Sequence, residues 1–330
     1  MIRNVLAKRD LKEYCPLCNR PFNSKRRRTK EHIFAKWLQE RYGLWDADFR
    51  IPNMFHKKYR SVRIGVCQQC NNETFGSLES RISKASEESL DGIDDDIIAA
   101  WLSKIFYLNA LNTTQFNDFG PGANREETIL PSEMREWMTY PGMLLNAFAF
   151  KKSMFSCFSF GFGTWRRPYS LYRYQIKSEQ SWDFDYMDFP FENGVALRLG
   201  SRGFVLLLDA GLHQKFRGPE QVVGENILHP LQFREVVARH FYDLTVLEPR
   251  ARQLRYAFAK QPNAVFAQIQ WNEKVNPFHV RFHDESRYVQ VISRFIPDFP
   301  RLLEEAGEGN IPTTLHDESG SFALYPGSSS

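Results

Sequence analysis

Apolar residues recur at helical spacing in two separate parts of the chain. The first stripe, within 97–108, follows the short, polar and acidic stretch 83–96, so we expect a helix that begins where this stretch ends. The second stripe, within 232–247, predicts another helix, which Pro249 would end. In both stripes the apolar side chains fall on one side of the expected helix, which is typical of a helix packed against other elements.

Short runs of aromatic and aliphatic residues, bounded by glycine, proline or charge, predict strands between these helices. They are 155–165, 170–177, 194–200 and 203–211. The last two runs are joined through a turn flanked by two glycines, which predicts a β-hairpin. Together these elements predict an α+β fold for this part of the chain, with a sheet packed on helices.

The acidic stretch 83–96 is also the best candidate for a domain boundary. With 330 residues, 42% of them hydrophobic, the chain is long enough for two domains that each have a core. We therefore expect an N-terminal domain, 1–85, and a mixed α+β domain, 94–325. For the second domain, binding a protein partner, selecting a substrate and forming a homo-oligomer are all open.

Targeting signals and cysteine usage indicate the compartment of the protein and a metal site. We find neither a leader sequence nor an apolar run that would span a bilayer, so we expect a cytoplasmic protein with no membrane attachment. Four of the five cysteines fall as two Cys-x-x-Cys pairs, Cys15/Cys18 and Cys67/Cys70. In a cytosolic chain this pattern favours a metal over disulfides. We therefore predict a structural Zn²⁺ held tetrahedrally by four thiolates.

The 48 residues between the two pairs are too many for a simple zinc ribbon, in which the gap is about 15 to 20 residues. A functional segment is therefore expected between the pairs. The candidate is TKEHIFAKWLQERYG, 29–43, in which Glu31 and His32 are adjacent. Histidine is the side chain whose ordinary pKa lies closest to neutrality, so His32 is a candidate general base.

Positive charge is concentrated in the same region. Residues 1–80 carry 17 Lys and Arg against 8 Asp and Glu, whereas the whole chain has a net charge of only +4. A polyanion such as nucleic acid is therefore the expected partner of this part. The basic run before Glu31 offers four side chains for flanking phosphates: Arg26, Arg27, Arg28 and Lys30. An arginine run alone is more often a solvated loop, but its position beside Glu31 and His32 favours phosphate contact.

Three stretches in order, CPLC, KEHIF and CQQCNNETF, resemble the HNH endonucleases, also called ββα-metal or His-Me finger nucleases. The similarity is to the subgroup with a four-cysteine zinc site, of the recombination endonuclease VII type, and it covers residues 14–80. It implies a zinc-supported ββα-metal (HNH) domain that hydrolyses phosphodiester bonds in DNA with the help of a second, catalytic divalent ion. It also implies anti-phage defence as a biological setting.

Carried over by position, Glu31 and Asn71 match the protein ligands of the catalytic ion, and His32 matches the general base. Carboxylate and amide oxygens suit a hard ion such as Mg²⁺ or Mn²⁺. The sequence departs from the usual pattern in two places. Asn71 stands where most members have their last histidine, and the middle asparagine has no clear equivalent, since Asn53 is only loosely spaced.

Two alternatives stay open. The four cysteines also fit a non-catalytic, zinc-stabilised nucleic-acid-binding regulator. The stretch 164–174, TWRRPYSLYRY, interleaves aromatic and basic residues as a single-strand binding surface does, although we favour a core strand. We expect Cys157 to be buried and unreactive. The histidines other than the candidate base His32 show no spacing typical of metal ligands.

Overall fold

The computed structural model describes most of the chain in separate stretches. The described residues are 11–50, 56–113, 139–149, 153–158, 167, 169–178, 183–209, 211, 213, 223–246, 255–261, 264–270, 285–296, 298, 299, 301, 304, 313–315 and 323. Contacts group the chain into two compact units. Unit 1 comprises Met1–Phe155 and Ala257–Ala267, and unit 2 comprises Ser156–Tyr256 and Gln268–Ser330.

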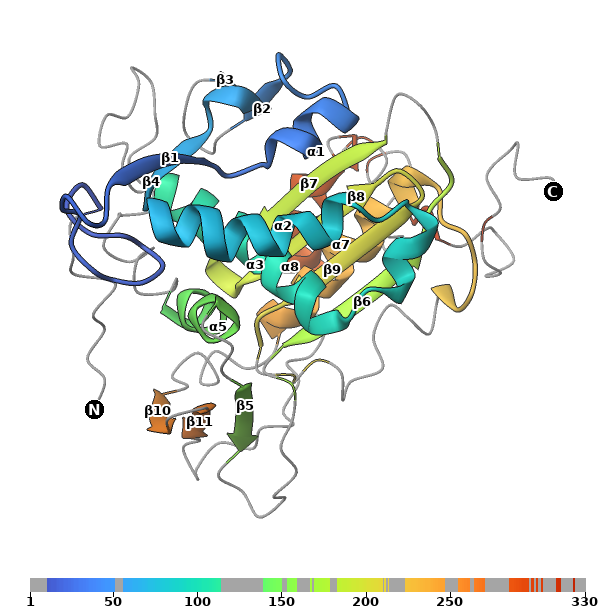
Figure 1. The fold of residues 1–330 in the computed structure, drawn as a ribbon. Helices are drawn as coiled ribbons and strands as arrows, with labels where there is room; N and C mark the ends of the chain where they lie inside the picture. The colour runs from blue at the N-terminus through green and yellow to red at the C-terminus, as the bar shows by residue number, and fades with distance from the viewer. Residues whose placement is uncertain are drawn as a thin grey trace, which may run out of the picture. The chain divides into compact units, whose positions relative to one another are not determined.

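The N-terminal part of unit 1 is built on a pair of short antiparallel strands, which lie side by side in Figure 1. Strand β1 (Arg28–His32) pairs with β4 (Arg63–Cys67), so that Arg28 lies opposite Cys67 and His32 opposite Arg63. The chain between these strands forms α1 (Lys36–Arg41), the pair β2 (Asp48–Arg50) and β3 (His56–Lys58), and the turn η1 (Tyr59–Ser61).

The chain leaves β4 directly into helix. A π-helical segment, η2 (Cys70–Phe75), continues into α2 (Gly76–Ser83), and η3 (Glu88–Gly92) follows. Helix α3 (Asp95–Thr113) then packs against both α2 and α5 (Thr139–Ala149). All residues from Ile98 to Asn112 are buried. The predicted helix is therefore confirmed, but it is enclosed on all sides instead of on one face.

Unit 2 contains a four-stranded antiparallel sheet in the order β6-β9-β8-β7. Its strands are β6 (Ser170–Gln175), β7 (Phe184–Phe189), β8 (Gly194–Leu199) and β9 (Arg202–Leu207), with η6 (Pro190–Glu192) between β7 and β8. Helices α7 (Pro230–Val246) and α8 (Glu285–Phe295) share one hydrophobic core with this sheet. The predicted hairpin is β8–β9, and Gly200 in its turn has a positive φ of 55°, which glycine adopts without strain.

A fourth sheet among the described residues has the order β10-β11-β5. Its strands are β5 (Ser153–Phe158), β10 (Arg255–Gln261) and β11 (Ala264–Gln270). With its mixture of helices and small antiparallel sheets, the chain has the α+β class that its sequence predicts.

The division between the two units lies later than the boundary near residue 85 that separates the expected domains 1–85 and 94–325. The acidic stretch 83–96 forms η3 and the start of α3, and both helices beyond it, α3 and α5, belong to unit 1. Among the described residues, no helix combines the length and the apolar character that crossing a membrane requires.

Candidate functional site

The four cysteines of the two Cys-x-x-Cys pairs come together in unit 1. Their sulfur atoms all lie within 4.8 Å of one another, although 48 residues separate the pairs in sequence. Cys15 and Cys18 stand on a tight turn in which the Asn19 backbone N–H donates to the Cys15 carbonyl at 2.9 Å. Cys67 ends β4 and Cys70 begins η2. The four-cysteine cluster therefore joins the N-terminal turn to the junction between strand and helix.

The chemistry of this cluster suits a thiophilic cation. The Cys67 backbone N–H lies 3.4 Å from the Cys15 sulfur, and the Cys18 and Cys67 sulfurs are 3.8 Å apart. The hydrogen bond from Cys15 lowers the pKa of the Cys18 thiol, and the same interaction raises the pKa of Cys15 to about 12. Four sulfur donors in one shell match the tetrahedral coordination of structural zinc, whose binding releases the thiol protons.

Strand β1 separates the other predicted site residues into two sets. Successive side chains of a strand point to opposite faces. Thr29 and Glu31 therefore share the inner face, where Glu31 is buried, whereas Arg28, Lys30 and His32 share the outer face. Glu31 and His32, adjacent in sequence, consequently stand in different surroundings.

On the inner face, Glu31 contacts a lysine that the sequence analysis did not single out. The Nζ atom of Lys104, on α3, lies 2.6 Å from a Glu31 carboxylate oxygen and 2.5 Å from Glu79, on α2. It also donates to the His32 carbonyl at 3.0 Å. The side chain of Lys104 is 0% exposed. A lysine inside a strongly apolar helical stretch was the one available signal for it, because such a charge needs a buried partner.

The charges in this cluster do not cancel. Burial raises the pKa of Glu31, Lys104 lowers it, and the nearby Glu79 raises it again. Burial opposes the charge of Lys104, yet Glu79 and Glu31 together raise its pKa. Two carboxylates thus share one ammonium group, which leaves the cluster short of positive charge when both carboxylates are ionised.

Asn71 approaches the same inner face. Its Nδ2 atom donates to the Thr29 hydroxyl at 3.0 Å, and that hydroxyl donates to the Val66 carbonyl at 2.9 Å. Thr29 is two residues before Glu31 and shares its face of β1. This hydrogen bond therefore holds Asn71, which directly follows Cys70 in sequence, at the face of β1 that carries Glu31.

His32 ends β1 on the outer face, opposite Arg63. Its ring centroid lies 6.1 Å from that of Trp45, and its Nε2 atom is enclosed with no hydrogen-bond partner among the described residues. Desolvation first, then the charges of Arg63, Lys36 and Lys104, lower its pKa to about 4. His32 is therefore neutral at neutral pH, as a general base must be.

The predicted ligands fit a catalytic divalent ion in donor type. Asn71 offers an amide oxygen, Glu31 a carboxylate, and the cluster around Glu31 has two carboxylates for one ammonium group. Carboxylate and amide oxygens are the donors that hard divalent ions prefer. Glu31 nevertheless shares its carboxylate with Lys104, and among the described residues the four cysteines form the one group of three or more metal-binding Cys, His, Asp or Glu side chains.

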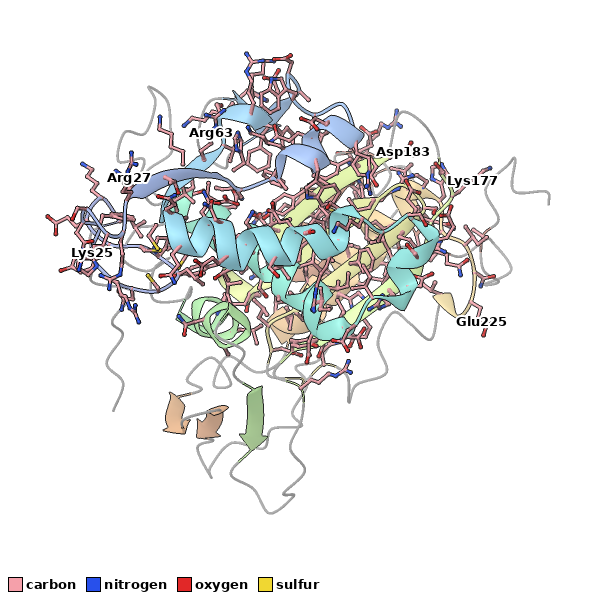
Figure 2. The ribbon with its side chains drawn as sticks, viewed as in Figure 1. Lys25, Arg27, Arg63, Lys177, Asp183 and Glu225 are labelled. Atoms are coloured by element: carbon pink, nitrogen blue, oxygen red, sulfur yellow. The ribbon has the colours of Figure 1, made fainter. Side chains whose placement is uncertain are left out.

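A groove of about 560 Å³ runs beside β1 and β4. Two of the predicted phosphate-binding residues, Arg28 and Lys30, line it, and Arg26 and Arg27 are outside its lining. Arg60 and Arg63 also line it, and sequence reasoning missed both. Figure 2 labels Arg63 and Arg27 near opposite ends of the β1–β4 pair.

The remaining candidates from the sequence have structural roles where they are described. Tyr172 and Tyr174 of the stretch 164–174 are buried in the core of unit 2. Their hydroxyls are 2.6 Å from His213 and His240, respectively, so these histidines have buried hydrogen-bond partners. The core interpretation of this strand is therefore confirmed. Other residues discussed from the sequence lie outside the described residues or have undescribed side chains: Asn53, Cys157, Trp165, Arg166, His279, His283 and His316.

No protein-family model, curated protein or solved structure matches this chain. The residues and geometry of the candidate site are therefore the basis for inferring the function.

Proposed function

We propose that this protein is a metal-dependent HNH-type endonuclease that hydrolyses phosphodiester bonds in DNA. The observation that carries the proposal is the position of His32, a neutral histidine that lies opposite Arg63, one of the arginines lining the cationic groove. Glu31 lies on the opposite face of β1, and Asn71, on η2, contacts that face through Thr29. A base, a cationic surface and two oxygen donors thus lie around one short strand.

Each residue of the site has a distinct role in the proposed hydrolysis. His32 accepts the proton of the attacking water, because its lowered pKa keeps the ring neutral and able to act as a base. Arg63 holds the negative charge of the phosphate beside this base. Glu31 and Asn71 would hold a Mg²⁺ or Mn²⁺ ion, which would supply stabilisation of the charge that develops on the phosphate. Lys104 fixes the carboxylate of Glu31 and the backbone of His32.

The local topology supports the same proposal. Two antiparallel strands, β1 and β4, are followed at once by a helical segment that begins at Asn71's neighbour Cys70. A strand–strand–helix order with zinc at the junction is the arrangement that the HNH resemblance implies. An anti-phage setting and a partner-binding, substrate-selecting or oligomerising role for the rest of the chain belong to this proposal as its biological context.

One observation favours a second candidate, a zinc-stabilised nucleic-acid-binding protein without hydrolytic activity. The ion pair between Glu31 and Lys104 already gives the buried carboxylate a partner, as in a purely structural site. The cationic groove would serve such a protein equally well.

The experiment that separates the candidates compares two histidine variants. Supercoiled plasmid is incubated with the wild type, His32→Ala and His56→Ala, each with and without Mn²⁺. His56 is an exposed residue of β3 in the same unit, so its loss controls for removing a histidine. We expect metal-dependent cleavage by the wild type and His56→Ala, and about 10²- to 10⁴-fold slower cleavage by His32→Ala. Metal-dependent cleavage at equal rates by all three proteins would exclude His32 as the base, and no cleavage by any of them would favour the binding protein.

A further inference from the structure

The outer face of β1 carries a row of positive charge, of which the basic run in the sequence accounts for only a part. Arg28, Lys30 and His32 alternate along this face, and Arg63 lies directly opposite His32 on β4. Positions two residues apart in a strand are separated by about 6.6 Å. Arg28, Lys30 and Arg63 therefore form a row whose steps resemble the spacing of successive phosphates along an extended nucleic-acid strand.

The groove beside this row is shaped by a glycine. Gly65 lies opposite Lys30, and a Cβ atom there would lie within 3 Å of the Arg28 guanidinium. The missing side chain lets Arg28 lie across β4, where its guanidinium is also 5.6 Å from the centre of the Phe22 ring. The cationic floor of the groove is thus a consequence of the register between β1 and β4.

Arg60 adds a fourth cation from the turn η1. Its backbone carbonyl accepts a hydrogen bond from Nε of Arg63 at 2.7 Å, which leaves the remaining nitrogens of the Arg63 guanidinium for another acceptor. The Arg60 guanidinium forms an ion pair with Asp46, whose side chain is 71% exposed. An exposed ion pair of this kind is weak, so a phosphate could displace Asp46.

We infer that this groove binds the sugar–phosphate backbone of one nucleic-acid strand, with Arg60 and Arg63 holding the phosphates nearest to His32. The inference extends the proposed function, because it names the residues that would align the strand with the base. It also stands without hydrolysis, since the groove would bind the backbone in a non-catalytic protein too.

The test measures binding of fluorescent oligonucleotides, single-stranded and duplex, at several salt concentrations without added divalent ions. The proteins are the wild type, Arg60→Ala/Arg63→Ala, and Arg287→Ala as a control. Arg287 lies on α8 in unit 2, outside the groove, and contacts Gln290. Zinc content and melting temperature of each variant establish that it is folded.

We expect the double variant to bind more weakly, with a log–log salt slope flatter by about 1.4 for the single strand or about 1.8 for the duplex. Arg287→Ala should keep the wild-type slope. A change with the single strand alone identifies a free strand as the occupant, and a change with both also admits a strand of a duplex. An unchanged slope with both oligonucleotides, or an equal change in Arg287→Ala, would overturn the inference.

A gain in affinity provides a second test that misfolding cannot imitate. Asp46→Asn removes the carboxylate that pairs with Arg60 and leaves the arginine free for phosphate. We expect affinity to rise by up to about fivefold. Unchanged or weaker binding by Asp46→Asn would contradict the role of Arg60. Weaker binding by the groove variant, together with no metal-dependent cleavage by the wild type, would refute the nuclease and leave the groove inference intact.

Discussion

Single charges decide how the candidate site is organised. Lys104 lies on α3 with its side chain buried, and its ammonium group contacts two carboxylates and the backbone of β1. Removing such a charge from water is costly, and the cost is offset only when every partner is well placed. The same lysine therefore ties helix α3 to the strand that carries Glu31 and His32.

Replacing Lys104 should expose this dependence. Lys104→Met would leave Glu31 and Glu79 facing each other in a buried site with no counter-charge. We expect unit 1 to lose about 3 to 5 kcal/mol of unfolding free energy, measured by denaturant unfolding. Lys36→Met, which removes an exposed lysine of α1, should cost no more than about 0.5 kcal/mol.

The corresponding triple variant tests the cause. Lys104→Met combined with Glu31→Gln and Glu79→Gln removes all three charges, so much of the lost stability should return. If Lys104→Met is as stable as the wild type, the cluster does not hold the strand in place. If the triple variant is no more stable than Lys104→Met, lost packing and not uncompensated charge is the cause.

Among the elements, the four-cysteine cluster stands where β4 becomes η2. Cys67 and Cys70 are the last residue of the strand and the first of the helical segment, and Asn71 follows immediately. A metal bound there would restrict the direction in which the helix leaves the strand. The same constraint would hold the Asn71 amide over the inner face of β1, where it donates to Thr29.

The zinc content of cysteine variants should reflect this arrangement. We expect about one tightly bound zinc per purified chain, because four thiolates complete a tetrahedral shell. Cys67→Ser should lose most of the metal and destabilise unit 1, whereas Cys157→Ser should keep it, since Cys157 belongs to neither Cys-x-x-Cys pair. Elemental analysis measures both. A well-folded wild-type protein without zinc, or equal loss in both variants, would contradict the assignment.

How much the sequence predicts depends on how local each feature is. The Cys-x-x-Cys pairs, the stripe of α3 and the β8–β9 hairpin are patterns within short windows, and the structure contains all three. The role of Arg63 depends on which residue of β4 faces His32, which is a register that no short window specifies. The contact between Lys104 and Glu31 joins residues far apart in sequence, so local periodicity does not reveal it.

Across the molecule, the four cysteines of the cluster all belong to unit 1. The sheet β6-β9-β8-β7 and helices α7 and α8 have a hydrophobic core of their own in unit 2. A ligand that binds only the folded form stabilises the part that binds it. Zinc should therefore stabilise one unit much more than the other.

Calorimetry with and without a zinc chelator tests this expectation under reducing conditions. We expect two unfolding transitions, of which chelation lowers one, because apparent zinc-binding free energies of about 10 to 16 kcal/mol contribute directly to folding in small zinc-binding domains. Cys67→Ser should show the lowered transition even without chelator and should not respond to its addition. The other transition should stay in place in every sample, since unit 2 contributes no ligand to the cluster. If chelation moves both transitions equally, or if the chain unfolds in a single transition that shifts as a whole, the two units do not unfold separately and zinc stabilises the entire described structure.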